Sequence, residues 1–191
     1  SSNTRSIENF SMENSTFKSE SANQKYIISL GASTSQDYKN IVFKNNVFYC
    51  PEGKVNQFGL FVGSKAGMAN CVLENNTFVN LETATTGMVY VDKLADISVK
   101  NNIFWTNTAG ANACIIFRPV TTSPSGTTCV NNIVYKTMTF NWQMFYGGKA
   151  PFEGMEQLNI LEANPFDGGT FDLANGIFVP NAEYAEYGAT N

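Results

Sequence analysis

CVLENNTF at residues 71–78 is one of five similar segments in this chain of 191 residues. The others are FSMENSTF (10–17), IVFKNNVF (41–48), ISVKNNIF (97–104) and TTCVNNIV (127–134). Their last residues, here termed anchors, are Phe17, Phe48, Phe78, Phe104 and Val134, at intervals of 31, 30, 26 and 30 residues. A degenerate sixth copy, ILEANPF, ends at Phe166. Self-similarity at this period indicates a repeat architecture.

Each copy has the pattern of a strand, a corner and a second strand. Apolar residues alternate before the Asn pair, as at Ile41 and Phe43, which is the period of a half-buried strand. Asn tolerates left-handed backbone, so the pair predicts a corner, and stacked corners would align their amides into a ladder. A second polar column comes just before the strands, at Asn9, Asn40, Asn70 and Asp96. A further strand-like run lies between copies: YIISL (26–30), FGLFV (58–62), GMVYV (87–91), ACIIF (113–117) and QMFYG (143–147).

These patterns predict an all-β fold, a single-stranded right-handed parallel β-helix of about six coils of 26–32 residues. Equivalent strands in successive turns of one chain must run parallel, about 4.8 Å apart. Parallel crossovers prefer the right hand. The missing Leu/Asn consensus excludes leucine-rich repeats, and propeller blades need about 40 residues each. A β-sandwich remains an alternative, although it would not require Asn pairs at a fixed phase.

The chain is predicted to be one domain, with coils over residues 1–150. Residues 151–191 then form the last degenerate coil and a C-terminal cap. This final stretch holds seven acidic residues and no Lys or Arg. A solenoid needs covered ends, and no comparable segment precedes the first copy. We therefore expect this chain to be the C-terminal part of a longer protein, with further coils or a domain upstream.

Composition excludes several classes of function. The net charge is −4 and no run of Lys or Arg occurs, so we expect no nucleic-acid partner. No apolar run approaches the roughly 18 residues of a membrane span. The chain contains no His, which excludes Ser-His-Asp and Cys-His catalysis. Cys71 and Cys129 occupy apolar strand positions and are predicted to be buried, unreactive thiols.

The combination of apolar strand, Asn-Asn corner and inward Phe resembles the pectate-lyase-like β-helix superfamily. It is especially similar to uncharacterised β-helix domains in cell-envelope proteins of Bacteroidetes. The resemblance covers residues 6–166, and FDLANGIF (171–178) looks like the closing strand of such domains. It implies a secreted or cell-surface protein that interacts with polysaccharide. Stacked Asn corners are structural, however, and lyases, hydrolases and adhesins share them.

One candidate binding row is basic. Lys65, Lys93, Arg118 and Lys149 each lie 14 to 17 residues after an anchor, and Asp92 is the carboxylate beside them. The row could contact an acidic glycan, or it could be a set of solvated corner charges. In a lyase, Lys93 or Arg118 would be the base that starts β-elimination. Calcium needs six to eight oxygen ligands, so no metal site is predicted and Ca²⁺ enters only with the lyase alternative.

A second candidate row is aromatic. Tyr49, Trp105 and Tyr135 each follow an anchor directly, so they face away from the core if the anchors face inward. Outward rings could stack on sugars. Alternatively, the cap or a neighbouring loop covers them, because large exposed aromatic patches are rare.

The sequence thus leaves three functions open. The first is a polysaccharide-binding module that is not catalytic as it stands and uses no cofactor. The second is a polysaccharide lyase that acts on acidic glycans. The third is a structural or adhesin-like stalk.

Overall fold

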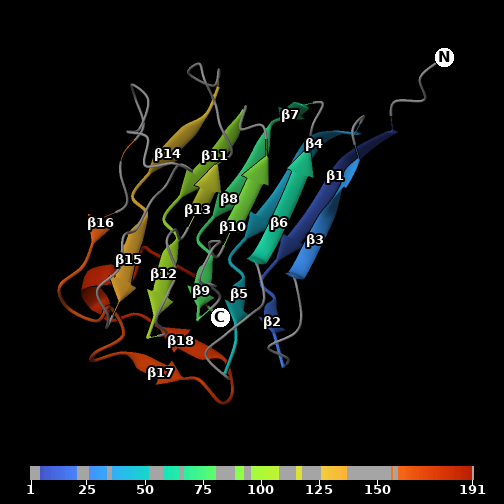
Figure 1. Cartoon of the computed structure of the whole chain (residues 1–191). Coiled ribbons are helices and arrows are strands. Elements are labelled where there is room, and N and C mark those ends of the chain that lie inside the picture. Colours follow the sequence, from blue (N-terminus) through green and yellow to red (C-terminus); the bar gives the residue numbers. More distant parts are fainter. Residues whose placement is uncertain are drawn as a thin grey trace.

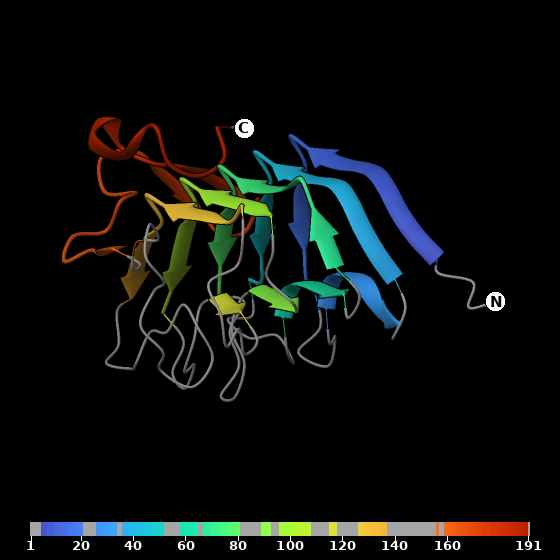
Figure 2. The ribbon, with the colours of Figure 1, turned by 90° about the horizontal axis from the view of Figure 1, so that it is seen from above.

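The computed structural model describes residues 5–20, 26–33, 36–51, 58–64, 67–80, 89–92, 96–107, 115–117, 126–136, 156 and 159–190. These residues form three parallel sheets and one antiparallel hairpin (Figure 1). Seen from above, the N-terminal and C-terminal strands of the parallel sheets lie at opposite ends of the stack (Figure 2).

Each parallel sheet takes its strands from successive copies of the repeat. Sheet A contains β1 (Arg5–Glu13), β4 (Gln36–Lys44), β8 (Cys71–Glu74), β11 (Ile97–Lys100) and β14 (Thr128–Val130), with β7 (Gly67–Ala69) also pairing with β4. Sheet B contains β2 (Thr16–Lys18), β5 (Val47–Tyr49), β9 (Thr77–Val79), β12 (Ile103–Thr106), β15 (Ile133–Lys136) and β16 (Asn159–Ile160). Sheet C contains β3 (Tyr26–Ser33), β6 (Phe58–Ser64), β10 (Val89–Asp92) and β13 (Ile115–Phe117). We term each copy a rung: rung 1 is β1 to β3, rung 2 is β4 to β6, rung 3 is β7 to β10, rung 4 is β11 to β13, and rung 5 begins with β14 and β15.

The strand register confirms the repeat for the first five copies. The anchors Phe17, Phe48, Phe78, Phe104 and Val134 stand opposite one another in sheet B. The sixth copy was misplaced, because Val134 pairs with Ile160 and not with Phe166. The strand ends at Ile160, and Phe166 packs instead against the C-terminal hairpin. Parallel sheets with one strand per rung are compatible with a β-helix.

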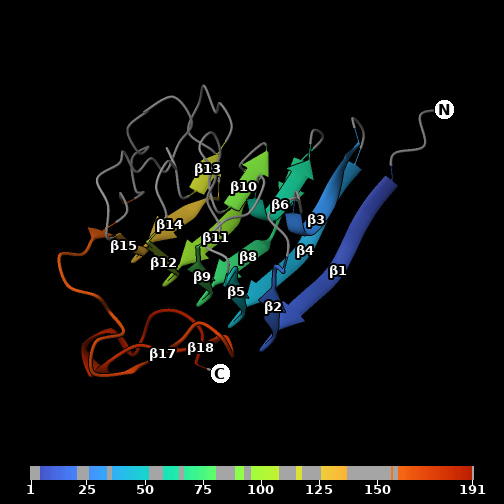
Figure 3. The ribbon, with the colours of Figure 1, turned by 60° about the horizontal axis from the view of Figure 1, so that its bottom comes forward.

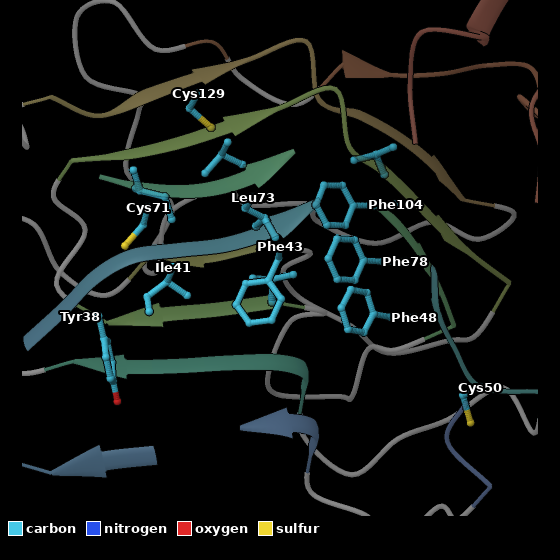
Figure 4. Packing of buried hydrophobic residues seen from close by; sticks show 14 residues of the cluster. Tyr38, Ile41, Phe43, Phe48, Cys50, Cys71, Leu73, Phe78, Phe104 and Cys129 are labelled. Atoms are coloured by element: carbon cyan, nitrogen blue, oxygen red, sulfur yellow. The ribbon is translucent and has the colours of Figure 1, made fainter. Parts of the chain in front are cut away.

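The anchors form the spine of the core. The rings of Phe17, Phe48, Phe78 and Phe104 stack in series, with centroid separations of 5.1, 4.9 and 5.0 Å. Figure 4 shows the last three of these rings side by side. Sheet A contributes the alternate apolar residues predicted from the sequence, including the buried Ile41, Phe43 and Leu73. The packed interior therefore lies between sheets that the repeat itself builds.

The two residues of each corner have different roles, and both are Asn in rungs 2 to 5, whereas Asn14 is followed by Ser15 in rung 1. The first residue has a positive φ between 52 and 55°, at Asn14, Asn45, Asn75, Asn101 and Asn131. The second is buried, at Asn46, Asn76, Asn102 and Asn132. Asn46, Asn76 and Asn102 each donate from Nδ2 to the Oδ1 of the buried Asn in the next rung, at 3.1, 3.0 and 2.8 Å. The predicted amide ladder is therefore present, and it lies inside the fold.

The second polar column forms a ladder on the surface. Asn40 Nδ2 donates to Asn9 Oδ1, and Asn70 Nδ2 donates to Asn40 Oδ1, both at 2.8 Å. The backbone N–H of Asn70 donates to Asp96 Oδ2 at 2.7 Å. All four residues have positive φ, so the column marks a second left-handed corner of the repeat.

The C-terminal segment lies over the outer face of sheet B (Figures 1 and 3). It contains the hairpin of β17 (Thr170–Asp172) and β18 (Ile177–Val179), followed by the 3-10 turn η1 (Ala182–Tyr184). Phe166, Phe171 and Phe178 pack with residues of β5 and β12 in a second apolar cluster. Strands β5, β9 and β12 of sheet B are consequently buried on both faces, which explains their nearly continuous apolar sequences.

Candidate functional site

The basic row cannot be located as a group. Lys65, Lys93, Arg118 and Lys149 lie outside the described residues. Asp92 is the last residue of β10, where its backbone stands opposite Gly63. The acidic-glycan and lyase interpretations of this row stay predictions.

The aromatic row is covered, as its second interpretation anticipated. Trp105 is 5% exposed, its Nε1 donates to Asn164 Oδ1 at 3.1 Å, and its ring lies 4.4 Å from that of Phe171. Tyr49 is 4% exposed, and its ring makes an edge contact with Phe178 at 5.7 Å. Tyr135, half-buried, lies 6.3 Å from Trp105. Tyr49 and Trp105 are thus packing surface for the C-terminal segment and not an open platform for sugars.

The cover ends at rung 2. The outward residues of sheet B are largely apolar or aromatic in rungs 2 to 5, including the buried Val47, Ile103 and Ile133. The exception in rung 3 is Thr77, which is also buried and accepts a hydrogen bond from Ala189 N. In rung 1 the corresponding outward positions are Thr16 and Lys18, and both are exposed. The change from buried to exposed outward residues marks where the cover by the C-terminal segment stops.

The last residues of the segment dock along the left-handed Asn column, from rung 4 back to rung 2. Asn75 and Asn45, neighbours in this column, both bond to the segment. Four hydrogen bonds fix this course: Gly188 N to Asn101 O (2.7 Å), Ala189 N to Thr77 Oγ1 (2.9 Å), Thr190 N to Asn45 Oδ1 (2.7 Å) and Asn75 Nδ2 to Glu186 O (2.8 Å).

A surface groove with a volume of about 270 Å³ lies beside Thr190. We term it the corner groove. It is lined by Glu13, Asn14, Lys44, Asn45, Asn75 and Thr190. These residues come from the end of sheet A, from the left-handed Asn column and from the C-terminal segment.

The groove offers hydrogen-bond donors and acceptors with balanced charge. Glu13 accepts from Ser11 Oγ at 2.5 Å and keeps further lone pairs. Asn14 Oδ1 accepts from Asn45 Nδ2 at 2.5 Å, and within the described chain Asn14 Nδ2 has no partner. Lys44 is exposed and makes no ion pair with any described residue. One carboxylate and one ammonium give the lining no net charge, which suits a neutral ligand rich in hydroxyl groups.

Sequence reasoning missed this groove for two reasons. Glu13 and Lys44 directly precede the Asn corners, a position that carries a charge in four copies, but no spacing rule distinguishes such a row from solvated charges. Thr190, which bonds Asn45, comes 145 residues later in the chain. Only the folded chain brings them together.

The described cysteines are structural. Cys50, Cys71 and Cys129 are buried thiols outside any disulfide, which agrees with the burial predicted for Cys71 and Cys129. Burial, with a smaller contribution from the Glu156 carboxylate, raises the pKa of Cys129 to about 12. Within the described part of the chain no cluster of three His, Cys, Asp or Glu side chains could hold a metal ion. The described residues also include no helix long and apolar enough to cross a membrane.

The site and the fold define an all-β protein built from parallel sheets. Comparison with protein-family models, curated proteins and solved structures finds no match to the chain.

Proposed function

We propose that this chain is a right-handed parallel β-helix that binds carbohydrate, and that the corner groove is its binding site. Several features support the fold assignment: one strand per rung in each of three parallel sheets, two columns of left-handed corners and a shared core. The right hand follows from the strong preference of parallel crossovers. A secreted or surface-exposed location is part of the proposal.

The observation that carries the proposal is the polar lining of the corner groove. Sugar hydroxyls both donate and accept hydrogen bonds, and the groove presents both kinds of group at Asn14, Glu13 and Lys44. A pocket of this size is at the lower end for small-molecule sites, so we expect it to hold one or two sugar units. Because the charges of Glu13 and Lys44 balance, a neutral glycan is favoured over an acidic one.

The test is a substitution that removes one amide from the groove and leaves the backbone undisturbed. Asn14→Gly keeps the positive φ of 52° without strain, because glycine adopts it freely. Losing one hydrogen bond should weaken binding of a neutral glycan about fivefold, measured by titration calorimetry with a ligand first selected on a glycan array.

Asn9→Gly is the matched control. Asn9 lies in the same rung, has a φ of 58° and accepts one amide bond from rung 2, but it lies outside the groove. We expect its affinity to equal that of the unmodified protein. Equal weakening by both substitutions, or binding of no glycan at all, would overturn the proposal, and the second result would favour the structural stalk.

The lyase alternative has a separate readout. Incubation with acidic polysaccharides and calcium would produce an absorbing unsaturated sugar if the chain were a lyase. Under the present proposal no such product forms.

A further inference from the structure

The outer face of sheet A carries a row of alternating charges. The strand register places Glu13, Lys44, Glu74 and Lys100 next to one another in rungs 1 to 4. Each is the last residue of its strand, directly before a left-handed Asn. We term this the charge row.

These charges are not paired with one another. The described residues contain two ion pairs, Lys18 with Glu20 and Lys39 with Glu8, and neither belongs to the row. The two carboxylates accept hydrogen bonds from serine hydroxyl groups instead: Ser11 Oγ donates to Glu13, and Ser98 Oγ donates to Glu74. Glu13 and Lys44 are exposed, whereas Glu74 and Lys100 are partly buried. Both ammonium groups therefore retain their donors for an external partner.

Over rungs 1 to 4 the neighbouring row on the same face is symmetric about its middle, and rung 5 adds Thr128 to this row and Val130 to the charge row beyond that symmetric part. Ser11, Val42, Val72 and Ser98 stand opposite one another in rungs 1 to 4. The two half-buried valines form an apolar centre, and a hydroxyl lies on each side of it. If the order of these four rungs is reversed, this row keeps the same sequence of residue types. In the charge row the same reversal places a positive charge opposite each negative one and a negative charge opposite each positive one.

We propose that this face binds a second copy of the chain through a two-fold axis that runs along the strands between rungs 2 and 3. Such an axis stacks the two sheets face to face and reverses the rung order in the partner. Glu13 then meets the partner's Lys100, and Lys44 meets the partner's Glu74. Val42 packs on the partner's Val72. The contact is isologous, so every pair occurs twice.

The interface is small. Four rungs about 4.8 Å apart and two rows of side chains cover a few hundred Å² on each copy. This is smaller than the roughly 800 Å² that each partner buries in a standard interface, so the dimer forms weakly and reversibly. Its attraction comes largely from exposed charges, and salt should weaken it.

Charge reversal at the two ends of the row provides the test. In E13K the introduced ammonium group meets the partner's Lys100, and this like-charge contact occurs twice in the dimer. In K100E the introduced carboxylate meets the partner's Glu13, again twice. Each variant alone should lose association in sedimentation-equilibrium measurements at low salt. An equimolar mixture should associate about half as well as the unmodified chain or better. In the heterodimer the ammonium group introduced by E13K meets the carboxylate introduced by K100E, and Lys100 of the first copy meets Glu13 of the second, so both ends pair opposite charges and no like-charge contact remains.

The double variant E13K/K100E should also recover self-association. Residues 13 and 100 lie three rungs apart, about 14 Å within one copy, so this rescue cannot come from an intramolecular ion pair. E162K makes the same charge change as E13K on an exposed residue outside sheet A, and it should associate normally. Circular dichroism and thermal unfolding establish that each variant is folded.

An unmodified chain that stays monomeric at high concentration and low salt would overturn the inference. A double variant that associates no better than the two single variants would do so equally. Glu13 and Lys44 also line the corner groove, whereas Lys100 does not. Sedimentation is measured without glycan, so its outcome does not depend on whether the groove binds carbohydrate.

Discussion

At the scale of single residues, the two Asn residues at the corners of rungs 2 to 5 have different structural roles. The exposed first Asn supplies a left-handed backbone, which glycine would supply equally well. The buried second Asn connects three rungs: Asn76 receives hydrogen bonds from Asn46, donates to Asn102 Oδ1 and donates to the backbone carbonyl of Phe43. Removing this side chain leaves several buried polar groups without a hydrogen-bond partner.

We therefore expect Asn76→Ala to lower the free energy of unfolding by about 3 kcal/mol or more, since each unsatisfied buried group costs about 1–3 kcal/mol. Asn40→Gly removes an exposed ladder amide and should cost less than about 1 kcal/mol. Urea unfolding followed by circular dichroism compares the two. Similar losses would contradict the structural role assigned to the buried ladder.

At the scale of elements, sheet B depends on packing against both of its faces. Phe78 is fully buried, with Phe48 and Phe104 at 4.9 and 5.0 Å on either side. Phe17, at the end of the series, has one described ring neighbour and is half-buried. The same residue type thus has two environments within one column.

Phe78→Ala should destabilise the fold by about 3–5 kcal/mol, as expected for a buried aromatic side chain that leaves a cavity. Phe17→Ala should cost about half as much, because less surface is buried at the end of the stack. Denaturant titration measures the loss of unfolding free energy in both variants, provided that their m-values equal that of the unmodified chain. A cost at Phe17 equal to that at Phe78 would mean that the stack has no free end.

At the scale of the whole molecule, the C-terminal segment ties rung 4 to rung 2. Gly188 has a φ of 69°, and a Cβ placed there would lie 2.5 Å from Thr77 Oγ1 and 2.7 Å from Ile103 Cδ1. Gly168 also has a positive φ, of 86°, but its Cβ would find its nearest described neighbour at 3.9 Å. Alanine at either position carries the same kind of backbone strain, and only one of them meets a clash.

Gly188→Ala should detach the end of the segment, and the amides of residues 188–190 should exchange with deuterium at least tenfold faster. In Gly168→Ala these amides should keep their protection, although the strained backbone costs about 1–2 kcal/mol of stability. Hydrogen-exchange mass spectrometry reads both. Unchanged exchange in Gly188→Ala would show that the segment is not held by this close approach.

Much of this fold could be predicted because its determinants repeat. Alternating apolar residues, Asn corners and anchors recur at one phase, so Phe48, Phe78 and Phe104 could be assigned to one column from spacing alone. The sixth copy failed because its anchor, Ile160, lacks both the Asn pair and the aromatic ring that define the others. The pattern is reliable where the same physical constraint acts on every rung.

By itself, the sequence determined the parallel strands, the left-handed corners, the amide ladder and the inert thiols, because each follows from local backbone preference or from the alternation of apolar residues. Tertiary structure alone decided that the C-terminal segment covers Tyr49 and Trp105, and that Thr190 closes one side of the corner groove. Those contacts join residues far apart in the chain. The sequence around an outward aromatic residue does not indicate whether that residue is exposed to solvent or covered by another segment. Local sequence preferences specify the structure of each rung. The path of the chain after the last rung determines which outer faces of the sheets remain exposed.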